Sequence, residues 1–182
     1  MRSDVTTWSL EMQDPADLRP APRPRADVEL RRALLPSAEF ARFLYTAVGG
    51  DWYWTDRLPW THQQWQDRLA TPGVETWVAY ECGTPAGYFE LELQAAEASV
   101  EIAYFGLLPG FIGKGIGGWL LTRAIERAWE VGAHRVWVHT CTLDGPNALA
   151  NYLARGMKVF KEVTAAQELP DSSPGPWPGA RD

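Results

Sequence analysis

A run of closely spaced glycines in the middle of the chain is the clearest candidate for chemistry. Gly113–Gly118 holds four glycines and Lys114, and from Ile116 the apolar residues repeat at helical spacing. Glycine lets a ligand approach backbone N–H groups without obstruction by Cβ. The first turn of a helix also carries unpaired N–H groups and a partial positive charge. The run therefore predicts an anion site suited to phosphate or pyrophosphate.

Several kinds of loop compete for this run, including a Gly-rich connection that binds nothing. A Walker-type loop does not fit, because Gly115 follows Lys114 where Ser or Thr is needed. Gly113, Gly115 and Gly118 satisfy the dinucleotide pattern Gly-x-Gly-x-x-Gly. However, Pro109–Ile112 separate the expected strand from these glycines, and too little chain follows for a doubly wound nucleotide domain.

Two blocks of this sequence can be compared with known families: Ile112-Gly113-Lys114-Gly115-Ile116-Gly117 and Asn147–Met157. Together they resemble the signatures of the GNAT superfamily of acyl-CoA-dependent N-acyltransferases. The first block matches the glycines of Gln/Arg-x-x-Gly-x-Gly/Ala, with Ile112 in place of Gln or Arg. The second block is similar to Asn-Ala-x-x-x-Tyr-x-x-x-Gly-Phe, with Met157 in place of Phe. The resemblance covers about Val28 to Val163.

This resemblance implies an α/β (α+β) fold with a mixed, mostly antiparallel central sheet flanked by helices. Two central strands would splay apart to admit the pantetheine arm of acetyl-CoA or another acyl-CoA. The residues implied to bind this cofactor are Phe105, Leu107, Leu108, Ile112, Gly113, Lys114, Gly115, Ile116, Gly117, Gly118 and Asn147.

The resemblance also implies two catalytic residues. Tyr152 matches the family tyrosine that protonates the thioester sulfur, and Glu101 matches the strand glutamate of histone-acetylating members. A packed helix aromatic and a surface glutamate are the simpler interpretations of these two residues. Glu90 and Asp144 are alternative bases, and direct attack by a free amine needs no strong base.

An aromatic segment supplies the candidate contacts to the substrate. Residues 51–65 contain four of the ten tryptophans. Tryptophan rings attract cations and bury a large apolar area. We therefore predict that Trp52, Trp54 and Trp60, together with Glu90, bind the acceptor amine; packing of a small helical flap on the sheet is the alternative.

The remaining pattern predicts the elements that position these residues. Strands are expected at 28–32, 75–80, 85–93, 100–107, 135–140 and 158–163. Helices are expected near 37–48, 61–69, 116–131 and 147–155. Short loops make the second to fourth of these strands an antiparallel meander, and the strand–helix–strand connection that follows implies one parallel pair.

The ends of the chain differ in composition from its middle. We predict a Pro/Arg-rich N-terminal strap or disordered lead at 1–26, an acetyltransferase domain at 27–169 and a Pro-rich tail at 170–182, solvated or strapped onto a partner. No apolar run is long enough to span a membrane or to form a signal peptide.

Charge and cysteine content narrow the class of function. The net charge of −6 argues against nucleic acid as a partner and is compatible with a cationic amine. The two cysteines, Cys82 and Cys141, imply no disulfide framework, so a cytoplasmic location is expected. Cys141 and His139 share one strand face, a spacing more typical of packing than of a nucleophile or a metal site.

Together these features predict an enzyme that transfers acetyl from acetyl-CoA to an amine of a small molecule or peptide. A non-catalytic acyl-CoA sensor or interaction module, and a dinucleotide-dependent oxidoreductase, are the alternatives. Exposed strand edges make a homodimer possible, and neither nucleic acid nor membrane is expected as a partner.

Overall fold

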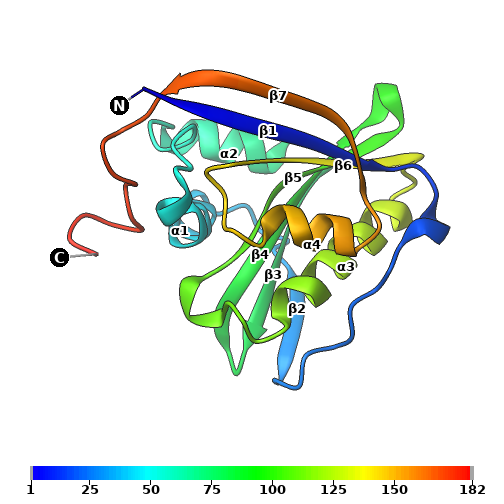
Figure 1. Ribbon diagram of the computed structural model, residues 1–182. Helices are drawn as coiled ribbons and strands as arrows, with labels where there is room; N and C mark the ends of the chain where they lie inside the picture. Colours follow the sequence, from blue (N-terminus) through cyan, green and yellow to red (C-terminus); the bar gives the residue numbers. More distant parts are fainter. Residues whose placement is uncertain (1, 181–182) are drawn as a thin grey trace.

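A computed structural model describes residues 2–180 of the chain (Figure 1). Met1, Arg181 and Asp182, at the outer ends of the expected strap and tail, lie outside the described residues. The strands are β1 (Arg2–Met12), β2 (Val28–Arg32), β3 (Val74–Glu81), β4 (Thr84–Gln94), β5 (Ser99–Leu107), β6 (Arg135–Cys141) and β7 (Lys158–Glu168). The helices are α1 (Ala38–Gly49), α2 (His62–Ala70), α3 (Ile116–Glu130) and α4 (Ala148–Ala154).

The strands form one mixed sheet in the order β2-β3-β4-β5-β6-β1-β7. Among the described residues, β5 and β6 are the one pair that runs parallel, because α3 connects them as a crossover. The β3–β4 hairpin turns at Cys82 and Gly83, which adopt φ angles of 49° and 82°. The predicted fold class is confirmed: the sheet is mixed and mostly antiparallel, and helices flank it.

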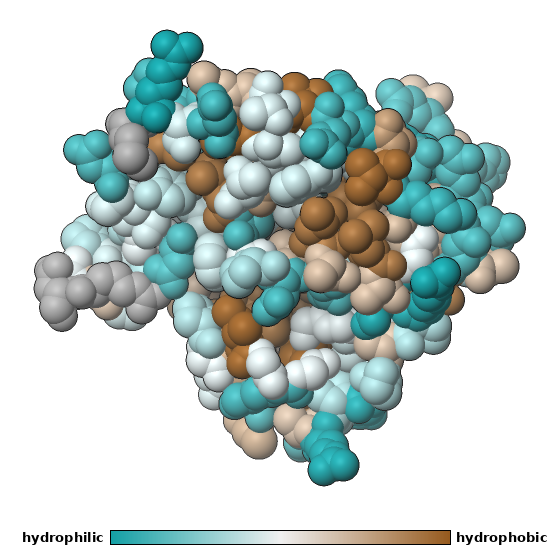
Figure 2. Space-filling model, viewed as in Figure 1, coloured by the Kyte–Doolittle hydropathy of each residue, from teal (hydrophilic) through white to brown (hydrophobic). Residues whose placement is uncertain are grey.

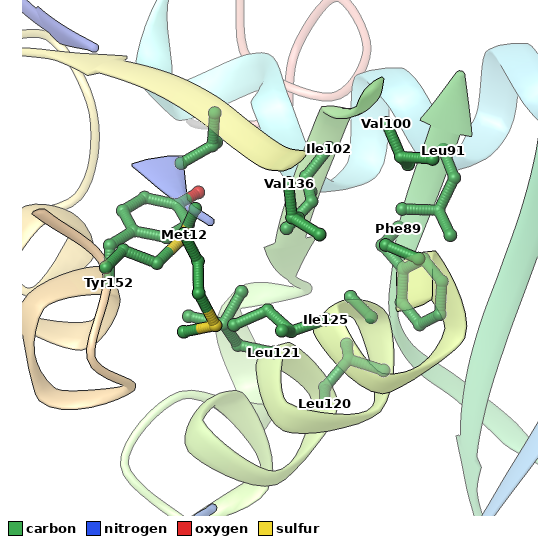
Figure 3. Close-up of a cluster of buried hydrophobic side chains, with 14 of the residues drawn as sticks. Met12, Phe89, Leu91, Val100, Ile102, Leu120, Leu121, Ile125, Val136 and Tyr152 are labelled. Atoms are coloured by element: carbon green, nitrogen blue, oxygen red, sulfur yellow. The ribbon is translucent and has the colours of Figure 1, made fainter. Parts of the chain in front are cut away.

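Helix α3 packs its apolar face against the middle of the sheet. Leu120, Leu121 and Ile125 are each 0% exposed. Figure 3 shows these side chains facing residues of β4 and β5, among them Phe89 and Ile102. Each fully buried side chain of this size contributes about 1.5–3 kcal/mol. This packing fixes the helix whose first turn carries the glycine run.

The N-terminal segment differs from the expected strap or disordered lead. Arg2–Met12 forms β1, which pairs with β6 on one side and β7 on the other. Val5, Leu10 and Met12 are almost completely buried, so this strand belongs to the core. The four prolines that suggested an irregular segment all follow the strand. How the chain divides into domains stays a prediction.

The C-terminal part of the chain also differs in detail from the prediction. Strand β7 continues to Glu168, whereas the sequence pattern predicted an end at Val163. The described part of the tail returns to its own chain, because the Gly175 N–H donates to the carbonyl of Gly50 at 3.0 Å. None of the helices within residues 2–180 has both the length and the apolar character needed to cross a lipid bilayer.

Candidate active site

A cavity opens where the two central strands separate. β5 and β6 pair only at Ser99–Arg135, Val100–Val136 and Glu101–Trp137. Beyond these pairs the strands splay, as predicted, and a cavity of about 960 Å³ lies between them. The β6-facing backbone groups in the rest of β5 have no partner on β6. An extended ligand lying in this opening would find backbone N–H and C=O groups available for hydrogen bonds.

The glycine run forms one wall of this cavity. Gly113 and Gly115 adopt left-handed φ angles of 85° and 79°, which other residues rarely tolerate. Gly115 is the N-cap of α3, and within residues 2–180 no side chain makes a capping hydrogen bond to the start of this helix. Apart from the directly adjoining residues, no described residue places an atom within 4 Å of the position that a Cβ would take at Gly113 or Gly115. The first turn of α3 therefore presents N–H groups that an anion can approach.

The structure brings most of the predicted cofactor residues to the cavity. Those that line it are Phe105, Leu107, Ile112, Gly113, Gly115, Gly117, Gly118 and Asn147. Three others do not line it. Ile116 is buried in the core, the backbone N–H of Leu108 donates to Ala86 at 2.9 Å, and Lys114 donates to Glu81 at 3.2 Å.

Arg155, just after α4, is a cation beside the glycine run that sequence reasoning missed. Its Nη1 atom lies 2.6 Å from the position that a Cβ at Gly118 would occupy. Its buried Nε has no hydrogen-bond partner among the described residues. The signal was present, since Arg155 lies in the block that contains Tyr152. Only the spatial neighbourhood of Gly118 reveals its position.

Tyr152 lies on the cavity wall that α4 contributes. Its side chain is 5% exposed, and its ring contacts that of Phe105 edge to face at 6.1 Å. Burial raises the pKa of Tyr152, and the charge of Asp144 raises this pKa further. The phenol therefore keeps its proton at neutral pH. Asn151 joins α4 to the glycine run through a 3.3 Å hydrogen bond to the Gly117 carbonyl.

Glu101 lies beside His139 but does not itself line the cavity. Glu101 is not among the lining residues, whereas His139 is. The Nδ1 of His139 lies 3.5 Å from a Glu101 carboxylate oxygen. The hydrogen bond with Glu101 raises the pKa of His139; burial opposes this effect, and the charges of Glu101, Asp144 and Asp56 reinforce it.

Asp144 is held rigidly at the end of β6. One carboxylate oxygen accepts hydrogen bonds from the Thr140 hydroxyl at 2.6 Å and the Cys141 N–H at 2.9 Å. The other oxygen accepts from the indole N–H of Trp54 at 3.4 Å. Burial, and secondarily the charge of Asp144, raise the pKa of Cys141. The Cys141 thiol is therefore not activated as a nucleophile, although both it and His139 line the cavity.

The tryptophan segment has two parts: residues that line the cavity, and a packed cluster around Trp60, Trp65 and Arg57 that we call the anchor. Trp52 and Trp54 line the cavity, as do Tyr45 and Tyr104. Trp60 does not; its ring packs against Trp65 at a centroid distance of 5.1 Å.

Glu90 is also part of the anchor and does not line the cavity. The residue is 4% exposed, and its carboxylate accepts two hydrogen bonds from Arg57, at 2.8 and 2.9 Å, and others from Arg68. Burial alone would raise the pKa of Glu90, but the hydrogen bonds and charges of Arg57 and Arg68 outweigh it and lower this pKa.

The described wall of the cavity carries carboxylates but no lysine or arginine. Asp56, Asp144 and Glu168 line the cavity, and none of its described lining residues is Lys or Arg. Within residues 2–180, no group of three or more His, Cys, Asp or Glu side chains is placed to hold a metal ion. The cavity thus combines the glycine run at the start of α3 with carboxylates and aromatic rings elsewhere on its wall.

Comparisons with known proteins agree with this geometry. The sequence model of the Acetyltransferase (GNAT) family matches residues 37–157. No curated protein matches the chain. A GCN5-related N-acetyltransferase from Kribbella flavida has a similar structure, with a TM-score of 0.64 and 22% identity over 96% of this chain and 60% of its own.

Two further solved structures have the same fold. A GCN5-related N-acetyltransferase from Sphaerobacter thermophilus gives a TM-score of 0.66 at 19% identity, covering 91% of this chain and 51% of its own. An aminoglycoside acetyltransferase from an uncultured soil metagenomic sample gives a TM-score of 0.59 at 17% identity, covering 70% of this chain and 86% of its own. The chain spans between 51% and 60% of the two GCN5-related proteins.

Proposed function

Because the chain belongs to the Acetyltransferase (GNAT) family, we propose that it transfers an acetyl group from acetyl-CoA to an amine of a small molecule or a peptide. The observation that carries this proposal is the continuity between the splayed strands and the uncapped glycine run. One cavity of about 960 Å³ reaches both. We also place the reaction in the cytoplasm, the expected compartment of a chain whose two cysteines are free.

The described residues fit acyl-CoA. The N–H groups at the start of α3 suit its pyrophosphate. Arg155 beside Gly118 supplies a cation near the loop, where Ile112 replaces the Gln or Arg of the family pattern. The unpaired edge of β5 suits the amides of the pantetheine arm. When bound, the cofactor supplies an acyl group activated as a thioester.

His139 is the group best placed to accept a proton from the acceptor's ammonium. Its Nδ1 faces Glu101, which leaves Nε2 as the proton acceptor when the imidazole is neutral. Glu101 then acts as a positioning residue that orients the ring, rather than as the base itself. This assignment keeps Glu101 in the reaction but gives proton abstraction to the residue that lines the cavity.

Tyr152 donates a proton to the leaving sulfur, and the proton that the attacking nitrogen loses on amide formation restores the phenol. Its raised pKa keeps the phenol protonated, so its hydroxyl can protonate the leaving sulfur at neutral pH. The two proton transfers lie on different elements, since His139 is on β6 and Tyr152 is on α4.

The cavity wall favours a cationic acceptor. Trp52, Trp54 and Tyr104 offer aromatic faces, and Asp56 and Asp144 offer negative charge. Amines are protonated at neutral pH, so the wall would attract the acceptor before His139 removes its proton. This chemistry fits amines with a second positive charge better than acidic amino acids.

Binding and turnover are tested in sequence. Calorimetric titration with acetyl-CoA is expected to give micromolar affinity, and NADH is expected to give none. Release of free thiol is then measured with a panel of monoamines, diamines and basic peptides. Absence of acetyl-CoA binding would refute the proposal, whereas binding without turnover on the whole panel would favour an acyl-CoA sensor.

A further inference from the structure

The outermost strand, β7, has an open edge (Figure 1). It is the last strand of the sheet and pairs only with β1 among the described strands. All of its residues, from Lys158 to Glu168, are exposed to solvent. A long edge strand presents unpaired backbone N–H and C=O groups along one side, which can pair with a further strand.

Large apolar side chains accompany this open edge. Val159, Phe160 and Val163 are 42%, 46% and 45% exposed, and Leu153 on α4 is 43% exposed. Figure 2 shows hydrophobic side chains gathered over α4 and the adjoining end of β7. An apolar surface beside unpaired backbone groups indicates a contact with another chain rather than with water.

The sequence of β7 is complementary to itself in one antiparallel register. If a two-fold axis perpendicular to the sheet relates two β7 strands, residues that lie opposite each other point to the same face of the joined sheet. Alternate residues of a strand share a face, so the axis must pass through the position of one residue rather than between two. With Val163 on the axis, β7 pairs regularly from Lys161 to Ala165, and Lys158 of each copy, beyond the register shift at Phe160, lies toward Glu168 of the other copy. An axis at Lys161 or Glu162 would place like charges opposite each other and leave one end of the strand unpaired.

We propose that β7 is a dimer interface, at which two copies of this chain pair their β7 strands antiparallel about Val163. The two sheets then join into one continuous sheet. The strand is already ordered for this contact, because Trp8 donates to Glu162 at 3.0 Å and the hydroxyls of Thr6 and Thr164 lie 2.8 Å apart. Pre-ordering lowers the entropy lost on association.

The ion pair between Lys158 of one copy and Glu168 of the other competes with an ion pair that Lys158 already makes within its own chain. Lys158 donates to Asp17 at 3.1 Å, and the two side chains are 75% and 42% exposed. Such a solvent-exposed pair is weak, so Lys158 can exchange Asp17 for Glu168 of the second copy. Glu168 also lines the cavity, which places the second copy beside the active site.

The mass of the protein in solution tests the dimer without any ligand, so the outcome is independent of the proposed function. Sedimentation at about 1 to 100 μM is expected to show twice the chain mass. Val163→Lys places two lysines opposite each other on the axis and is expected to raise the dissociation constant at least tenfold. The matched control is Leu35→Lys, at an 84% exposed site outside β7, which is expected to leave the mass unchanged.

A cysteine at the axis tests the register. In a Cys82→Ser background, Val163→Cys is expected to form an intermolecular disulfide on oxidation, because directly opposite Cα atoms lie about 4.5–5.5 Å apart. Ala165→Cys lies on the same face, but its two copies would be about 13 Å apart, so it is expected to stay uncrosslinked.

Three results would overturn the proposal: a monomer at 100 μM, a Val163→Lys dimer as tight as the unchanged protein, or equal crosslinking at residues 163 and 165. Circular dichroism of each variant tests whether the fold is retained, so that loss of the dimer can be distinguished from unfolding of the variant.

Discussion

At the scale of single residues, Tyr152 separates turnover from cofactor binding. Tyr152→Phe keeps the ring that packs against Phe105 and removes only the hydroxyl. Loss of a general acid is expected to lower kcat by about 10²-fold or more, while the affinity for acetyl-CoA stays within twofold. Steady-state thiol release and calorimetry measure the two quantities. An unchanged kcat would assign Tyr152 to packing alone.

His139 sets the expected pH dependence. Protonated imidazole cannot accept a proton, so kcat/KM should rise with pH through the pKa of His139. The hydrogen bond with Glu101 and the surrounding carboxylates raise that pKa, so the midpoint should lie above the ordinary value of 6.5. Glu101→Gln removes one of these charges and should move the midpoint down. His139→Asn should abolish this rise of kcat/KM with pH. If the rise persists in His139→Asn, another residue is the base.

Arg155 is expected to contribute to cofactor affinity. A charge-assisted hydrogen bond contributes about 1.5–3 kcal/mol, so Arg155→Ala should weaken acetyl-CoA binding roughly tenfold or more. Arg155→Lys keeps the charge and should recover part of this loss. Titration of the same variants with acetyl-dephospho-CoA shows whether the 3′-phosphate is the contact. Equal affinity of Arg155→Ala and the unchanged protein for acetyl-CoA would remove Arg155 from the site.

At the scale of elements, the buried pair of Arg57 and Glu90 anchors the tryptophan segment to β4. The Arg57 guanidinium lies over the Tyr104 ring at 4.3 Å and over Trp60 at 4.7 Å, so one cation organises several rings. Removing one partner of a buried ion pair costs about 3–5 kcal/mol. Glu90→Gln should therefore lower the free energy of unfolding by about 3 kcal/mol.

Glu92 offers a matched control for this anchor. It also accepts a hydrogen bond from Arg68, but its side chain is 32% exposed. Glu92→Gln is expected to cost about 1 kcal/mol or less in urea unfolding. If Glu90 bound the acceptor instead, Glu90→Gln would raise KM without the larger loss of stability.

The elements that depend on local sequence were predictable, and contacts between distant segments were not. The glycine run and α3 follow from residue spacing alone, and Thr61 caps α2 as expected. By contrast, Glu90 looked available for catalysis because its partner Arg57 is 33 residues away. Lys114 likewise looked free to bind phosphate until the fold placed Glu81 beside it.

At the scale of the whole molecule, β1 shows why composition misled. Its residues Trp8, Leu10 and Met12 alternate with polar residues, as in a half-buried strand, but the prolines and arginines that follow dominate the average over residues 1–26. Its neighbours in the sheet, β6 and β7, come from the far end of the sequence. Such pairing is set by long-range burial, which local pattern does not reveal.

A substitution in β1 distinguishes a core strand from a peripheral strap. Leu10 is 0% exposed, so Leu10→Ala should lower the free energy of unfolding by about 2–5 kcal/mol. Asp4→Ala, at an exposed position of the same strand, should change it by about 0.5 kcal/mol or less. Urea denaturation measures both. Since β1 separates β6 from β7, its loss would also detach β7 from the sheet and, with it, the proposed dimer edge. If Leu10→Ala and Asp4→Ala were equally stable, β1 would be a peripheral strap and not a strand of the core.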